Sequence, residues 1–254
     1  MTPAEAALLV GVGAVASGLN AVAGGGSLIS FPTLTVVVGL PEKIANATNS
    51  VGLWPGSLSG GIGFKNLFEK TSRYLAKLFI PTLLGSLCGA ILLLNTSNKV
   101  FKEVIPGLIL LASCLLLFQP KVKELVLKRH AKLPEPYGWV LQFLVSTYGG
   151  YFGAGMGIMM LAAFALYMEG TIHELNAVKN WLGLIINFSC SAVFIWQGLV
   201  EPWPAVWIVV GALIGGFAAA KVSQRFNPDK LRVAIAIYGF AMTAFFVWRA
   251  FGTK

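Results

Sequence analysis

Apolar residues dominate the chain in long runs, which short clusters of glycine or charge interrupt. The first half contains five such runs, at residues 4–23, 27–40, 44–64, 75–94 and 104–118. The second half contains five more, at residues 137–152, 156–168, 175–198, 204–220 and 231–251. Apolar residues cover all sides of these runs instead of alternating with polar ones, which predicts helices and not strands. A helix needs about 20 residues to cross a bilayer, so the run 27–40 is too short to span comfortably.

The two sets of runs repeat one plan at a constant distance in the chain. A shift of 131 residues, without gaps, pairs Gly24 with Gly155, Gly26 with Gly157, Gly39 with Gly170, Asn49 with Asn180 and Gly85 with Gly216. The same shift pairs residues 98–100 (Asn-Lys-Val) with residues 229–231 (Asp-Lys-Leu). A single offset that holds across about 80 residues and also matches an asparagine indicates an internal duplication.

Charge placement predicts how the two halves are oriented. Basic residues gather after the third run, at Lys65, Lys70, Arg73 and Lys77, and again between residues 119 and 136. The corresponding loop of the second half, residues 199–203, carries only Glu201. Basic loops stay on the cytoplasmic side. The third run therefore runs from outside to inside in the first half and from inside to outside in the second half. This pattern predicts inverted repeats with both termini outside, although Lys99 and Lys102 then fall on the outer side.

Composition agrees with a membrane protein. Hydrophobic residues make up 56% of the 254 residues and charged residues 11%, which is too little polar surface for a soluble globule of this size. We therefore predict an all-α polytopic membrane protein built from two inverted repeats of about five helical segments, with short broken or re-entrant helices at glycine-rich motifs. The predicted parts are an N-terminal repeat (1–118), a basic cytoplasmic linker (119–136) and a C-terminal repeat (137–254).

Net charge and cysteine positions exclude several classes of partner. The chain has 19 Lys and Arg against 10 Asp and Glu, but these bases lie mostly in short loops, where they set orientation. We expect the lipid bilayer as a partner and no nucleic acid. Cys88, Cys114 and Cys190 lie inside apolar runs without Cys-x-x-Cys spacing or a neighbouring His, so we expect no metal, cofactor or disulfide framework.

Two glycine-rich breaks between apolar runs are the candidate ligand site. Residues 23–32 read Ala-Gly-Gly-Gly-Ser-Leu-Ile-Ser-Phe-Pro, and residues 153–158 read Gly-Ala-Gly-Met-Gly-Ile. Such clusters cannot hold an ordinary helix, so backbone groups are freed within an apolar region. Irregular backbone at membrane depth is tolerated only inside protein or beside a wet cavity, which favours a binding site. A tight loop at the membrane surface is the alternative.

The chemistry around the breaks favours an anion. If each break starts a short helix, free N–H groups and the positive end of a helix dipole face the site. Side chains in the following run add donors. The predicted substrate-binding residues are Gly24, Gly25, Gly26, Ser27, Thr48, Asn49, Gly155, Gly157, Asn176, Lys179 and Asn180. Lys179 is the most informative, because a lysine inside an apolar run faces a cavity or a partner, unless it extends to water at the interface as a topology anchor.

The motifs resemble those of a known family. Residues 20–28 (Asn-Ala-Val-Ala-Gly-Gly-Gly-Ser-Leu) with Pro32, Gly39 and residues 47–49, followed by a second copy with residues 176–180, are similar to the TauE/SafE family of sulfite exporters. The resemblance implies a multi-pass transporter in the bacterial cytoplasmic membrane that moves small sulfur-containing anions such as sulfite, sulfoacetate or other organosulfonates. The second copy departs from the first by having Lys179 in place of Thr48, which places symmetric roles of the two motifs in doubt.

We therefore interpret the chain as a secondary transporter that exports such anions by alternating access around a midplane site, one repeat moving against the other. No glycine-rich loop ending in Gly-Lys-Ser/Thr occurs, which argues against an ATP-driven pump and leaves protons or the membrane potential as the candidate driving force. A passive anion channel is the alternative. A membrane-embedded enzyme is disfavoured, because the acidic residues lie at segment ends or in loops.

Overall fold

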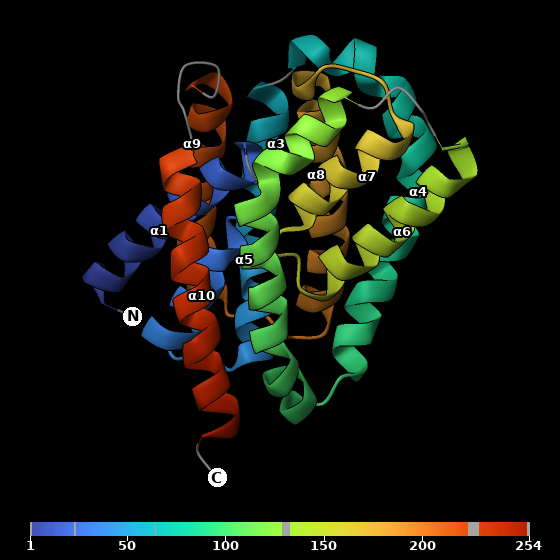
Figure 1. Cartoon of the computed structure of the whole chain (residues 1–254). Helices are drawn as coiled ribbons and strands as arrows, with labels where there is room; N and C mark the ends of the chain where they lie inside the picture. The colour runs from blue at the N-terminus through green and yellow to red at the C-terminus, as the bar shows by residue number, and fades with distance from the viewer. Residues whose placement is uncertain (1, 23, 64, 129–132, 223–228, 253–254) are drawn as a thin grey trace.

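The computed structural model describes residues 2–22, 24–63, 65–128, 133–222 and 229–252, and within them the chain is helical and contains no strand (Figure 1). The first half forms α1 (Pro3–Val22), α2 (Ser27–Pro32) with a π-helical extension (Thr33–Val37), α3 (Glu42–Gly63), α4 (Phe68–Asn95) and α5 (Asn98–Lys128). The second half forms α6 (Glu135–Tyr151), α7 (Met156–Tyr167), α8 (Ile172–Trp196), α9 (Pro202–Val222) and α10 (Asp229–Phe251). Each predicted apolar run corresponds to one of these elements, which confirms the all-α prediction.

The basic segment 119–136 is partly helical. Helix α5 continues through Pro120 to Lys128, and α6 begins at Glu135. Residues 129–132 lie outside the described residues, as do Arg225 and part of the basic loop after α9. The apolar run of α5 ends near residue 118, so the last turns of this helix carry the basic residues beyond the apolar stretch.

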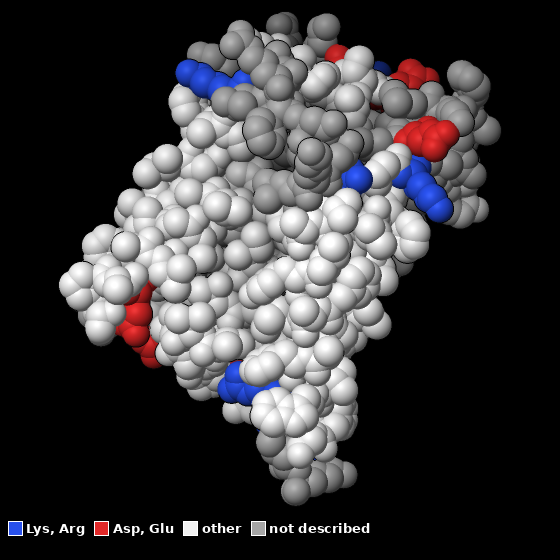
Figure 2. All heavy atoms as spheres, turned by 60° about the vertical axis from the view of Figure 1, so that its left-hand side comes forward, with Lys and Arg blue, Asp and Glu red and all other residues white. Residues whose placement is uncertain are grey.

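Six of the described helices are long and apolar enough to cross a membrane. They are the segments Pro3–Ala21, Thr71–Asn95, Asn98–Val122, Ile172–Trp196, Pro202–Ala219 and Arg232–Phe251. Figure 2 shows a broad uncharged band on the visible face, with Lys, Arg, Asp and Glu gathered at its two ends. The protein is therefore a multi-pass membrane protein.

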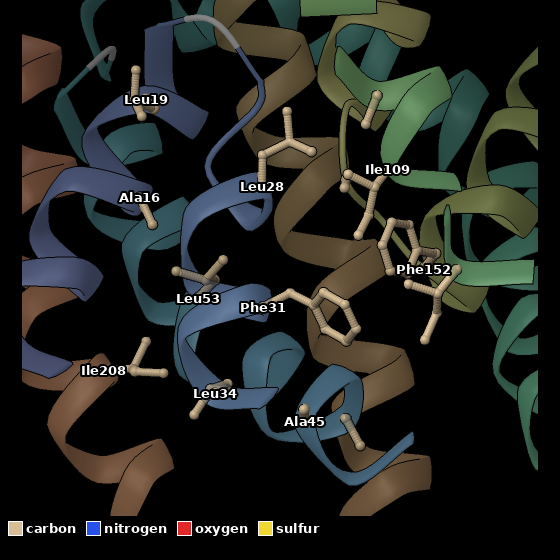
Figure 3. Packing of buried hydrophobic residues seen from close by; sticks show 14 of the residues in the cluster. Ala16, Leu19, Leu28, Phe31, Leu34, Ala45, Leu53, Ile109, Phe152 and Ile208 are labelled. Atoms are coloured by element: carbon tan, nitrogen blue, oxygen red, sulfur yellow. The ribbon is translucent and has the colours of Figure 1, made fainter. Parts of the chain in front are cut away.

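Two helices are too short to cross. Ser27–Val37 and Met156–Tyr167 contain 11 and 12 residues, and at 1.5 Å per residue each is about 17 Å long, roughly half of the hydrocarbon thickness. Most of their side chains are buried against other helices. Figure 3 shows Leu28, Phe31 and Leu34 of the first short element among residues of neighbouring helices, and Phe31 meets Phe152 edge to face at 5.3 Å.

Pro32 explains the π-helical extension of α2. Proline has no N–H and pushes away the carbonyl of the preceding turn, so the regular ladder cannot continue through it. Hydroxyl groups bond to the carbonyls of this turn: Thr33 Oγ1 donates to Ile29 O at 2.8 Å, and Thr35 Oγ1 donates to Phe31 O at 3.1 Å. The threonine hydroxyls therefore satisfy backbone carbonyls around the proline in this buried segment.

The two ends of the helix bundle can be distinguished by their contacts. We call the end with both chain termini the termini face. There, Glu42 at the start of α3 pairs with Arg249 near the end of α10, at 3.6 Å. Lys43 Nζ donates to Thr96 O, between α4 and α5, at 2.8 Å. The first turns of α1 and α9 share a groove on this face, so both helices begin there.

The opposite end, which holds residues 128 and 135, we call the linker face. Because α4 ends on the termini face, it begins on the linker face, where its Lys77 pairs with Glu135 at the start of α6. Helices α1, α3 and α9 therefore run from the termini face, whereas their counterparts α6, α8 and α4 run from the linker face (Figure 1). These opposite directions confirm the predicted inverted repeats.

The repeats are interlocked and do not form separate bundles. Helix α1 packs parallel to α9 of the other half, where a Cβ on Gly211 or Gly215 would overlap the carbonyl oxygens of Val10 or Ala14. In the same way, α6 packs parallel to α4, where a Cβ on Gly89 would overlap Thr147 O. Small residues four apart allow this backbone approach between membrane helices. The first helix of each half therefore packs against a helix of the other half.

Candidate functional site

The glycine-rich breaks form the tips of two hairpins inside the protein. Helix α1 enters from the termini face, and after the turn that contains Gly24, Gly25 and Gly26 the chain returns to the same face through α2 and its extension. Helices α6 and α7 make the equivalent hairpin from the linker face. Gly24 (φ +86°) and Gly155 (φ +78°) adopt left-handed conformations that favour glycine. This explains why each of the two turns has a glycine at this position. The predicted broken, re-entrant helices are thus confirmed.

The two tips touch each other. A Cβ on Gly24 would lie 2.9 Å from Gly157 Cα, and a Cβ on Gly157 would lie 2.9 Å from Gly24 Cα. The other glycines of the first tip meet protein as well: a Cβ on Gly26 would overlap Ala16 O, and one on Gly25 would lie 3.0 Å from Leu116 Cδ1. These glycines therefore allow backbone segments to approach one another at the centre of the bundle.

Lys179 of α8 lies at the junction of the tips. Its side chain is 2% exposed, and Nζ donates to Ala21 O at 3.2 Å and to Asn176 Oδ1 at 2.9 Å. Because Ala21 is in the last turn of α1, the ammonium group sits at the negative end of that helix dipole. The alternative of an interfacial anchor that extends to water is wrong, since the side chain is buried.

The stem of Lys179 also passes the first turn of α7. A Cβ on Gly157 would lie 3.2 Å from Lys179 Cδ. The N-terminus of α7, which is the positive end of its helix dipole, therefore lies beside a buried cation. Two positive features at one buried place repel each other and attract an anion.

Three asparagines hold this arrangement. Asn176 Nδ2 donates to Ile172 O at 2.9 Å, which turns its Oδ1 toward Lys179. Asn180 Nδ2 donates to Ala21 O at 3.3 Å, so two side chains of α8 share one carbonyl. Asn20 Oδ1 accepts from Gly26 N at 2.8 Å and satisfies a backbone group at the start of α2. Asn20 is outside the predicted set, although a polar residue next to the break was a usable signal.

The corresponding residues of α3 are placed differently. Thr48 is fully buried, and its Oγ1 accepts from Glu201 N, in the turn between α8 and α9, at 3.0 Å. Asn49 is 2% exposed, and its Oδ1 has no hydrogen-bond partner among the described residues. Asn46, which the prediction omitted, instead donates from Nδ2 to Tyr151 O at the tip of the second hairpin, at 2.9 Å.

The predicted residues therefore divide into two groups, although all of them are buried. The structure brings Gly24 and Gly157 together with Asn176, Lys179 and Asn180, whereas Gly25, Gly26 and Gly155 meet Leu116, Ala16 and Ala112. It places Thr48 on the turn that contains Glu201 instead. Glu174, a loop residue by sequence, closes a capping box with Thr171 at the start of α8 and so has a local structural role.

The sequence was compared with known proteins. A family model described as "Sulfite exporter TauE/SafE" matches residues 9–246. A protein of Haemophilus influenzae named "Probable membrane transporter protein" is 28% identical over 243 residues, which cover 95% of this chain and 94% of the relative. The "Probable membrane transporter protein YfcA" of Escherichia coli K12 is 26% identical and covers 100% of this chain and 94% of its own length. A relative from Sinorhizobium, "Probable membrane transporter protein ORF9", is 23% identical over 85% of this chain and 80% of its own length. No solved structure matches significantly.

Proposed function

Because the chain belongs to the TauE/SafE family of sulfite exporters, we propose that it exports small sulfur-containing anions, such as sulfite, sulfoacetate or other organosulfonates, as a secondary transporter. The family and its relatives make the chain a membrane transporter. The substrate class follows from the family description, the proposed location is the bacterial cytoplasmic membrane, and the candidate coupling ion is the proton.

The buried Lys179 beside the N-terminus of α7 is the observation that supports an anionic substrate. Its ammonium group donates to a carbonyl and an amide oxygen, which are neutral acceptors. An anion that entered this junction would replace neutral acceptors by a charge-assisted hydrogen bond, which is roughly twice as strong. The positive end of the α7 helix dipole would add electrostatic attraction for an anion.

Alternating access around this junction is the proposed mechanism. The interlocked helices change which parts move: α1 packs with α9 and α6 with α4, so each moving body contains helices of both halves. The sequence-based picture of one repeat moving against the other is replaced in the proposal by two mixed bodies. The tips of the hairpins lie between these bodies, which is where a carried anion must pass from one side to the other.

Counterflow in proteoliposomes tests transport and separates it from the rival anion channel. Vesicles loaded with unlabelled sulfite are diluted into labelled sulfite, and a carrier accumulates label transiently because it exchanges one bound anion for another. We expect saturable flux with counterflow for sulfite or an organosulfonate. Flux that rises linearly and shows no counterflow would indicate a channel and would contradict the proposal.

The substrate is identified by thermal stabilisation of the purified protein. A ligand that binds only the folded state at 100 times its Kd adds about 2.7 kcal/mol of stability, so its melting temperature rises measurably. The panel contains sulfite, sulfoacetate, sulfate, acetate and chloride at equal ionic strength. Stabilisation by acetate as strong as by the sulfur anions would remove the claim to sulfur specificity.

A further inference from the structure

Corresponding residues of the two half-sites are in different states. From Gly24 to Leu53 the chain aligns without gaps on residues Gly155 to Leu184, with Asn in both copies at 49 and 180. If the copies were in the same state, the bond from Asn180 to Ala21 O would have a counterpart from Asn49 to Phe152 O. The structure instead has Asn46 bonded to Tyr151 O, three residues earlier on α3.

Three residues are nearly one helical turn, or about 5 Å along the helix axis. Helix α3 therefore bonds its tip through an asparagine almost one turn earlier than α8 does, and at a carbonyl one residue earlier on the tip. Asn49 is buried and its side chain makes no hydrogen bond to the described residues, although a buried amide is costly when unbonded. An asparagine whose amide N–H groups are unbonded in one copy and bonded in the other is a sign of two states.

We infer that Asn49 is a second latch, which alternates with the latch formed by Lys179 and Asn180, and that Thr48 holds α3 in the present state. In the present state α8 is latched to Ala21 O, and Thr48 holds α3 at the Glu201 amide. In the alternate state α3 slides by a turn, Thr48 leaves the Glu201 amide, and the Asn49 side-chain amide donates to Phe152 O. At the same time α8 releases Ala21.

The inference rests on the proposed function and gives it a sequence of events. Release of Ala21 O removes an acceptor from Lys179, so the latch on α8 controls how strongly the ammonium group attracts an anion. One-turn shifts of a packed helix are an established way to switch between two discrete packings. The two latches thus couple the affinity of the site to the face on which it opens.

Two cysteine pairs report the two states. A Cβ on Gly60 would lie 3.4 Å from the Cβ of Ala21, close to the spacing of a disulfide, so Ala21→Cys with Gly60→Cys should crosslink in the present state. The corresponding pair, Phe152→Cys with Ser191→Cys, should crosslink only in the alternate state. Both pairs are placed in a background with Cys88, Cys114 and Cys190 replaced by alanine and are oxidised in membranes without substrate.

Thr48→Val removes the acceptor for the Glu201 amide and should favour the alternate state. We expect it to slow crosslinking of the 21/60 pair at least about 3-fold and to speed the 152/191 pair. Thr243→Val is the matched control, because among the described residues the Thr243 hydroxyl bonds to Gly239 O, one turn away on α10, at 2.9 Å. A protein with all four cysteines should contain one bridge or the other, never both.

Two bridges in one molecule, or a 152/191 pair that never forms in a folded protein, would overturn the inference. If Phe152→Cys does not fold, the 21/60 pair alone remains decisive: an unchanged rate in Thr48→Val would also overturn it. These assays use no substrate. Exclusive bridges without transport of sulfur anions would therefore refute the proposed function and leave the latches standing.

Discussion

The two hairpins share their backbone and differ in the side chains that surround them. Gly24 and Gly155 adopt the same left-handed conformation at the same place in each repeat. The position after the break that carries Thr48 in one copy carries Lys179 in the other, and their contacts differ accordingly. The two hairpins therefore keep the glycines that their turns require, whereas the polar residues at corresponding positions have separate roles.

The largest expected effect separates the two tips at a matched glycine. A Cβ on Gly26 would overlap the backbone carbonyl of Ala16, whereas a Cβ on Gly157 meets Gly24 Cα and the flexible stem of Lys179. Gly26→Ala should therefore destabilise the protein by about 3 kcal/mol or prevent folding, and Gly157→Ala should cost less. Melting temperature and monodispersity in detergent measure both. Gly107→Ala, where nothing lies within 4 Å, is the control, and equal effects at 26 and 157 would contradict the comparison.

Removing the charge that distinguishes the copies should affect binding most. Lys179→Met is expected to weaken anion binding by about 1.5–3 kcal/mol, or 10- to 100-fold, because a charge-assisted donor is lost. Thr48→Val should cost less, since only a neutral hydroxyl is removed. Titration of the identified anion against each purified variant gives the dissociation constants. Normal affinity in Lys179→Met would show that the anion binds elsewhere.

The paired asparagines isolate one hydrogen bond. Asn180 donates to Ala21 O, whereas Asn49 has an unpartnered Oδ1. Both Asn→Ala changes remove the same number of buried atoms, so the difference between them approximates the worth of the bond. Asn180→Ala should lower the free energy of unfolding by about 1 kcal/mol more than Asn49→Ala. Thermal unfolding under identical conditions measures this difference, and the opposite order would be incompatible with the described contacts.

The smallest effect is expected where the second hairpin begins. Lys77, through its hydrogen bond and its charge, holds the pKa of the Glu135 carboxyl below its ordinary value. A lowered folded-state pKa stabilises the protein above the ordinary pKa of the carboxyl, and this contribution disappears as pH falls through the folded-state value. Since Glu135 is exposed, Glu135→Gln should change the melting temperature little at pH 7, and the change should shrink further as acid protonates the carboxyl. A large change at pH 7 would mean that this pair does more than join α4 to α6.

Apolar runs and charge were sufficient to predict the helices, the duplication and the inversion. They did not predict that α5 continues through Pro120, because the basic residues after position 118 were assigned to a linker. The exchange of α1 and α6 between the halves was also missed, since Gly85, Gly89, Gly211 and Gly215 indicate close packing without naming the partner.

At the site, residue types were predictable and partners were not. Lys179 was singled out because a buried charge is costly in an apolar run. Its observed acceptor is a backbone carbonyl, Ala21 O, which every residue type carries and no sequence pattern marks. The different bonding of Asn49 and Asn180 was equally unpredictable, because both copies have the same residue and differ only in which groups lie near it.

The interlocking of α1 with α9 has a consequence for biosynthesis. During translation α1 leaves the ribosome about 200 residues before the helix whose Gly211 and Gly215 it packs against, a long-range contact of the kind that slows folding. Until then its own small-residue face has only lipid or the insertion machinery as neighbours. We therefore expect the nascent first half to lack the close packing that α9 provides, so that a fragment ending at Lys128 is degraded by membrane proteases faster than the complete chain.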